Sequence, residues 1–277
     1  MTKPIFKYFL LLLLLATSFV SCQKVIQVNL KEADEKYIVE ALITDSFDYN
    51  YVKLSKTSSF YNSNFDNTGV EDAIIIVTDL SNNQAYTFYE FSKGTYKHPS
   101  IQVAPNKSYA LLIVVGNDTI TATSSVPSTK VLIDSIYVQK SEFSFFSEMY
   151  EAVPAYTDPV GIGNYYLLKS YLNRQNNTPF YFTSDEFIDG QVNKSALSFR
   201  VKNYDDVDDI YDFKKGDTLT VELYNTTKPV YTFFSTLRQN SSAVVGNPAN
   251  PTSNVNGKAI GVFIAATVSH ATIIANY

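Results

Sequence analysis

The sequence contains no tryptophan, one cysteine and two histidines among its 277 residues. A single cysteine cannot form an internal disulfide, so packing alone stabilises an exported form of this chain. Histidine is the usual base beside a nucleophilic serine or cysteine, yet His98 and His270 lie far apart in the sequence. The nucleophile-elbow, zinc-protease and phosphate-loop motifs are absent too. We therefore expect no enzymatic activity and no cofactor, with an unrecognised hydrolase as an alternative.

Basic residues are also in the minority. The chain has 22 Lys and Arg against 27 Asp and Glu, a net charge of −5. Nucleic acids and anionic lipids attract basic surfaces, so we expect no nucleic-acid partner. Hydrophobic residues make up 45% and charged residues 18%, which is typical of a folded protein. The 21 tyrosines and 19 phenylalanines favour β-strands, because aromatic side chains fit a pleated surface.

The first 21 residues have the pattern of a signal peptide. Lys3 and Lys7 precede an apolar run, residues 8–16, and small or polar residues follow it. This run is too short to span a membrane, which takes roughly 20 apolar residues. The only cysteine, Cys22, comes next and has Ser21 before it.

The junction at Cys22 resembles the lipobox of bacterial lipoproteins, although Phe19 stands where Leu or Val is usual. The resemblance implies cleavage before Cys22 and its acylation, for example with palmitate. The protein would then contact the membrane through its lipid anchor only, with residues 22–36 as anchor and tether. An ordinary secreted protein with a free or buried cysteine is the alternative.

Short strand signals follow one another from residue 37 to residue 126. Seven or eight such strands with turn residues between them predict a mainly β fold, and here an immunoglobulin-like or fibronectin-like β-sandwich. Tyr109 enters an apolar strand after a short loop, as in a tyrosine corner, or it is simply a core tyrosine. The clearest hairpin joins residues 108–115 to residues 119–123 through a turn at Gly116–Asp118.

Residues 127–129 are the expected boundary to a second β-rich domain, residues 130–277. One short helix is expected at residues 228–239, with Pro229 in its first turn. Strands are expected at residues 131–138, 165–172, 197–201, 218–224 and 257–266, with an additional edge at 271–277. Gly261 suggests a bulge in the closing strand.

Two groups of residues are candidates for binding. The acidic run Asp205–Asp209, with Asp212 beyond it, could supply oxygen ligands to calcium. A solvated acidic loop is the preferred interpretation, so we expect no metal site. Aromatic residues on expected loops could contact a partner or ligand, since tyrosine is favoured at interfaces, or could belong to the core. They are Phe60, Tyr61, Phe65, Tyr165 and Tyr166.

The mature chain resembles a family of uncharacterised outer-membrane lipoproteins of Bacteroidetes-type bacteria, whose members carry a domain of unknown function. The resemblance rests on an ordered series of short stretches: Cys22 with Lys24 and Ile26, then residues 37–41, 71–77, 94–96, 108–111, 158–166, 216–221, 250–257 and 259–263. Such proteins are commonly encoded beside SusC-like TonB-dependent receptors. The resemblance implies a non-enzymatic, lipid-anchored accessory or ligand-capture partner of a TonB-dependent nutrient transporter. A structural or adhesive cell-envelope lipoprotein is the alternative.

The same resemblance bears on location and modification. Surface-exposed lipoproteins of these bacteria often carry acidic residues after the cysteine, whereas Gln23, Lys24 and Val25 are not acidic, so both the periplasmic and the surface leaflet stay open. Related bacteria attach O-glycans at Asp-Ser/Thr followed by an aliphatic residue. Thr119, Thr218 and Ser135 fit that pattern. We expect Thr119 to be the most occupied because it follows a turn, and Ser135 the least because it lies in an apolar run.

Overall fold

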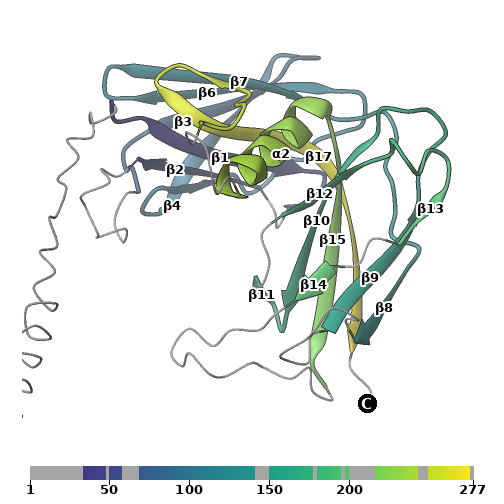
Figure 1. Cartoon of the computed structure of the whole chain (residues 1–277). Helices are drawn as coiled ribbons and strands as arrows, with labels where there is room; N and C mark the ends of the chain where they lie inside the picture. Colours follow the sequence, from purple (N-terminus) through teal and green to yellow (C-terminus); the bar gives the residue numbers. More distant parts are fainter. Residues whose placement is uncertain are drawn as a thin grey trace, which may run out of the picture. The chain divides into compact units, whose positions relative to one another are not determined.

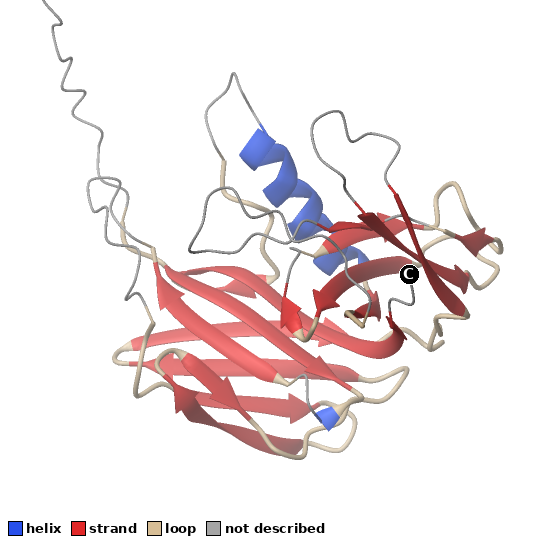
Figure 2. Ribbon diagram, turned by 90° about the horizontal axis from the view of Figure 1, so that it is seen from below, coloured by secondary structure: helices blue, strands red, loops and turns tan. Residues whose placement is uncertain are grey.

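The strands form one large curled sheet and one smaller sheet, as the computed structural model in Figures 1 and 2 shows. It describes residues 34–47, 50–57, 69–140, 150–176, 180–194, 197–199, 216–242 and 249–274. The chain is therefore mainly β, as expected from its composition. Within the described residues, α2 (Lys228–Ser242) is the one α-helix, and it begins at the position that Pro229 predicts.

The large sheet has 13 strands and combines elements from both ends of the chain. Its order is β11-β10-β15-β17-β1-β2-β5-β4-β3-β6-β7-β16, with β12 beside β10. The strands from the first half of the sequence are β1 (Tyr37–Thr44), β2 (Tyr51–Lys56), β3 (Ile74–Asp79), β4 (Gln84–Ser92), β5 (Thr95–Lys97), β6 (Ser108–Val115) and β7 (Asp118–Ser125). The others are β10 (Tyr165–Leu172), β11 (Gln175–Asn176), β12 (Tyr181–Ser184), β15 (Thr218–Thr226), β16 (Val255–Asn256) and β17 (Ala259–Ile274).

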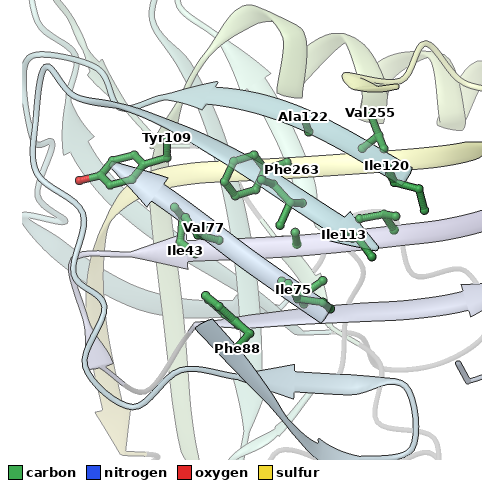
Figure 3. Close-up of a cluster of buried hydrophobic side chains, with 14 of the residues drawn as sticks. Ile43, Ile75, Val77, Phe88, Tyr109, Ile113, Ile120, Ala122, Val255 and Phe263 are labelled. Carbon is green, nitrogen blue, oxygen red and sulfur yellow. The ribbon is translucent and has the colours of Figure 1, made fainter. Parts of the chain in front are cut away.

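Alternation of apolar and polar residues places one face of β1–β7 inside the curl. In β7, for example, Ile120 and Ala122 are buried while Thr119 and Thr121 are exposed. Figure 3 shows the resulting core between strands that face each other. The labelled residues are Ile43, Ile75, Val77, Phe88, Tyr109, Ile113, Ile120, Ala122, Val255 and Phe263.

The predicted hairpin is present, and of the two interpretations left open for Tyr109 the structure supports the tyrosine corner. Val115 pairs with Asp118 across the turn at Gly116 and Asn117. The ring of Tyr109 is buried, and its hydroxyl accepts the N–H of Ala104 at 3.1 Å. That bond to backbone a few residues upstream is the defining contact of a tyrosine corner.

The closing strand is longer than the sequence predicts. The sequence pattern separates residues 257–266 from an edge at 271–277, but β17 runs without a break from Ala259 to Ile274. Its first half pairs in parallel with β1, and its second half pairs in antiparallel with β15. Both halves therefore belong to one strand with two different neighbours, and no turn separates them.

The smaller sheet contains β8 (Ser135–Lys140), β9 (Tyr150–Thr157), β13 (Val192–Asn193) and β14 (Leu197–Phe199). Its buried side chains, such as Ala152 and Tyr156, pack against Leu168 and Leu223 on one face of β10 and β15. The helix α2 packs through Val230 and Phe233 with side chains that include Leu42 and Ile264. Among the described residues, no helix is long and apolar enough to cross a membrane.

The expected boundary at residues 127–129 lies between β7 and β8. Residues at this boundary contact both halves of the sequence. The side chain of Asn225, in the second half, donates to the carbonyl of Thr129, and the ammonium of Lys130 lies 2.6 Å from the carboxylate of Asp45 in the first half. Residues from Glu35 to Tyr277 form one compact unit. The division into two separately folding domains stays a prediction, and β17, which pairs with strands of both halves, provides the way to test it.

Candidate functional site

Several residues that the sequence singles out lie outside the described residues. They are Cys22, Phe60, Tyr61, Phe65 and the acidic run Asp205–Asp209 with Asp212. Of the glycosylation candidates, Thr119 is exposed beside the β6–β7 turn and Thr218 is half-buried. Ser135 is exposed on β8, so burial gives no reason to rank it last.

The two remaining aromatic candidates differ in their surroundings. Tyr165 is half-buried, and its ring centre lies 5.2 Å from that of Tyr231 on α2. Tyr166 has an exposed fraction of 0%, and its hydroxyl donates a hydrogen bond to the carboxylate of Asp158. Burial, together with this acceptor, raises the pKa of Tyr166. Tyr166 is therefore a core residue that positions an aspartate, and its ring cannot contact a partner.

That aspartate belongs to a cluster that the sequence does not predict. Asp158 follows β9, whereas Asp185 and Asp189 lie in the turn after β12. One carboxylate oxygen from each of the three residues lies within 4.8 Å of the corresponding oxygens of the other two. The fold thus brings two loops together, residues 158–164 and residues 185–190.

Hydrogen bonds from one loop to the aspartates of the other hold the two loops together. The buried carboxylate of Asp185 accepts the backbone N–H groups of Gly163 and Asn164 at 2.8 and 2.9 Å, and the side-chain amide of Asn164 at 3.1 Å. In the other direction, Gly190 donates to Asp158 at 3.1 Å. Asp189 accepts the N–H of Gly161 at 2.6 Å. Charged acceptors make these bonds stronger than neutral ones, so the loops are stiff.

Glycine is required where the two loops meet. Gly161 and Gly163 have φ angles of 116° and 126°, a conformation that residues with a Cβ atom rarely adopt. Gly190 has a φ of 68°, and a Cβ added there would come within 3.1 Å of the Val160 side chain. Glycine therefore lets Val160 lie close against the second loop.

The three carboxylates are also the one group of possible metal ligands found among the described residues. Calcium takes 6–8 oxygen ligands, of which three carboxylates supply a part. In this structure N–H and O–H donors already point at the carboxylates. The arrangement is therefore explained by loop-to-loop hydrogen bonding without any ion.

The stiff loops present apolar side chains to solvent. The exposed fractions are 90% for Val160, 76% for Ile162 and 87% for Phe187. Along the sequence, Ile162 lies between Gly161 and Gly163, which donate to Asp189 and Asp185. Phe187 lies between these two aspartates, so loop-to-loop hydrogen bonds flank both apolar residues. We call Val160, Ile162 and Phe187 the apolar tip. Single exposed apolar residues are common, but several on adjoining rigid loops are typical of an interaction surface.

The sequence does contain a signal for this site. In Asp158-Pro-Val-Gly-Ile-Gly-Asn164 the apolar residues alternate with glycine, between an aspartate and an asparagine. Such a stretch cannot form a stable strand or helix, because glycine weakens both. The aromatic pattern points instead to the tyrosines that follow it, one of which proves to support the loop from inside.

The two histidines show no shared site. His98 is half-buried, and its Nδ1 accepts the N–H groups of Ser100 and Ile101 at 3.1 and 3.0 Å. His270 is exposed on β17, in register with Glu222. His98 therefore has a structural role in the turn after β5.

Comparison with known proteins gives a family and no activity. No curated protein matches the sequence. The model of the domain of unknown function DUF4249 matches residues 23–272, which is most of the chain and includes both loops of the site. The protein therefore belongs to the DUF4249 family.

Proposed function

We propose that this protein is a lipid-anchored outer-membrane accessory that binds a TonB-dependent nutrient transporter through the apolar tip. The observation that carries the proposal is the exposure of Val160, Ile162 and Phe187 on loops stiffened by buried aspartates. Interfaces concentrate their binding energy in a few apolar and aromatic side chains. Such side chains contribute most when they are already held rigidly, because little conformational entropy is then lost on binding. On this proposal the protein binds its partner and catalyses no reaction.

The leader and Cys22 support the membrane part of the proposal, because a lone cysteine behind a leucine-rich leader resembles a lipobox. One acyl chain gives only marginal membrane binding, so stable attachment needs more than one. Cys22→Ser should abolish labelling with a fatty-acid analogue in the native host. Equal labelling of both proteins would refute acylation at Cys22.

The partner is tested by detergent extraction and affinity purification of the tagged protein from its native host. We expect a SusC-like transporter to co-purify with the wild type and to be lost with Phe187→Ser and with Ile162→Ser. Leu80→Ser is the matched control, since Leu80 is also exposed but lies in the turn after β3.

Two results would contradict the proposal, and they have different meanings. A transporter that is recovered equally with all variants would place its binding site away from the apolar tip. If the wild type brings down no transporter, the accessory role is wrong and the structural or adhesive alternative takes its place.

A further inference from the structure

A second group of exposed apolar side chains lies on the outer face of β3 and β4. The exposed fractions are 58% for Ile74, 66% for Tyr89 and 70% for Phe91. The ammonium of Lys97 lies 4.1 Å from the ring centre of Phe91. Five strands of the large sheet separate β4 from β10, which follows the first loop of the apolar tip, so this is a different surface.

The pairing of the strands shows at which end of the sheet this surface lies. Tyr37, where β1 begins, pairs with Lys56, where β2 ends. The turn after β4 is next to the end of β2, because Leu54 donates to the carbonyl of Gly94 at 2.8 Å. Ile74, at the start of β3, pairs with Val114 near the end of β6.

The strand ends at this edge also connect back to the first strand. The N–H of Tyr37 donates to the carbonyl of Lys258 at 3.0 Å, and Asn256, two residues before Lys258, pairs with Thr121 near the start of β7. The start of β1, the β4–β5 turn, the start of β3 and the β6–β7 turn therefore form one edge of the curled sheet. We call this edge the tether rim, because the chain enters the compact unit here at Glu35.

The length of chain before Glu35 limits how far the tether rim can lie from an anchor. Twelve residues, Gln23–Asp34, separate Cys22 from Glu35. Fully extended, they span about 40 Å at most. An acyl group at Cys22, which is part of the proposed function, would keep the tether rim within this distance of the lipid surface.

The side chains at the tether rim suit a lipid surface. Tyrosine and phenylalanine have apolar rings that enter the boundary between headgroups and acyl chains, and a neighbouring lysine can keep its ammonium among the headgroups. Behind Ile74 the outer face continues with the half-buried pair Ile76 and Leu112.

Charge decides which lipid is expected. Exposed lysines at the tether rim include Lys93 and Lys258, but Glu71, Asp72 and Glu90 are exposed there too. This balance gives no net attraction to anionic headgroups. We infer that the tether rim rests on zwitterionic lipid, with Ile74, Tyr89 and Phe91 inserted at the interface, as a second membrane contact that rests on the proposed anchor at Cys22.

The sequence contains no tryptophan, so Phe91→Trp introduces the only one, and all tryptophan fluorescence of the variant comes from this position. The mature chain from Gln23 carries an N-terminal histidine tag. It is bound to phosphatidylcholine vesicles that contain a nickel-chelating lipid and brominated acyl chains, which quench nearby tryptophan. The matched control is Phe187→Trp, a reporter on the apolar tip. Because the chelating lipid replaces the acyl anchor, the result is independent of acylation at Cys22 and of any transporter.

We expect the emission of the Phe91→Trp variant to shift to shorter wavelength and to be quenched several-fold more strongly than that of the Phe187→Trp variant. Adding anionic lipid should not increase this quenching. Equal and weak quenching of both variants would overturn the inference and leave the surface for a protein partner. Stronger quenching of the Phe187→Trp variant would overturn it as well, because the apolar tip would then face the lipid.

Discussion

Asp185 is the residue on which the shape of the candidate site depends most. Its buried carboxylate accepts three N–H donors from Gly163 and Asn164. Asp185→Asn replaces one acceptor oxygen by an amide that points hydrogens at these donors. We expect a loss of about 2–3 kcal/mol in the free energy of unfolding, since hydrogen bonds to charged groups are worth about 1.5–3 kcal/mol. Urea denaturation measures it.

The control for this prediction is Glu186→Gln in the same turn. Glu186 is exposed, so its change should stay within about 0.5 kcal/mol. A variant Asp185→Asn that is as stable as the wild type would mean that these hydrogen bonds do not hold the loops.

His98 provides a prediction about pH. Burial lowers the pKa of His98, and protonation would also remove the acceptor that Nδ1 provides to Ser100 and Ile101. The unfolded chain therefore binds this proton more readily than the folded chain does. Stability from neutral His98 is complete above the unfolded pKa of about 6.5 and is lost as the pH falls toward the folded value.

We therefore expect the melting temperature to fall from about pH 6.5 downward, and to fall less in His98→Asn, whose Oδ1 keeps an acceptor near the position of Nδ1. Thermal melts of both proteins between neutral and mildly acidic pH decide this. A fall in melting temperature that is equally steep in His98→Asn would contradict the assignment.

The roles of single residues are predictable from sequence where the cause is local. Tyr109 has the pattern of a tyrosine corner because its bond goes to Ala104, five residues upstream. The role of Asp185 cannot be predicted in this way, since its donors lie 21 and 22 residues away and in another loop. The exposure of Phe187 likewise depends on the fold, because an isolated phenylalanine in a sequence is normally assigned to the core.

Among the elements, β17 has one position that decides its pairing. Gly261 has a φ of 148°, and a Cβ there would lie 1.9 Å from the carbonyl oxygen of Val39 on β1. Gly261→Ala should therefore force β1 and β17 apart and reduce stability by about 3 kcal/mol or more, as severe backbone clashes do. The sequence suggests a bulge at Gly261, but this prediction is wrong, because Ile260, Gly261 and Val262 pair with consecutive residues of β1.

The matched control is Gly116→Ala in the β6–β7 turn. Gly116 also has a positive φ, 57°, but a Cβ there meets nothing within 4 Å. It should cost only about 1–2 kcal/mol, the ordinary penalty of a left-handed non-glycine residue. Chemical denaturation of both variants measures the difference, and equal losses would show that close approach to Val39 is unimportant.

The elements themselves are predictable where neighbours in sequence are neighbours in space. The β6–β7 hairpin follows from one turn, and α2 follows from helical spacing and Pro229. The parallel pair of β1 and β17 joins residues more than 200 positions apart. No local pattern specifies such a pairing, so the length of β17 is predicted wrongly and its partners are not predicted at all.

For the whole molecule, the shared strand makes a prediction about folding units. The core inside β1–β7 includes Val255, Ala259, Phe263 and Ala265 from the end of the chain. A fragment of residues 37–126 lacks these side chains and leaves the edge of β1 unpaired. We expect it to be unfolded by circular dichroism, whereas residues 34–277 unfold in a cooperative transition.

A fragment that melts cooperatively by itself would support the two-domain division that the sequence predicts. The unpaired edge of β1 also makes aggregation a foreseeable result of the deletion. Adding a peptide of residues 253–274 to the fragment distinguishes the cases, because restored structure would show that β17 supplies what is missing.

The position of β17 also sets the order of events when the protein is made. The first strand, β1, leaves the ribosome more than 200 residues before the part of β17 that pairs with it. The sheet cannot close until β17 has been synthesised, and long-range pairing of this kind is slow. For the exported form that we propose, this delay would keep the chain unfolded until it reaches a translocation channel.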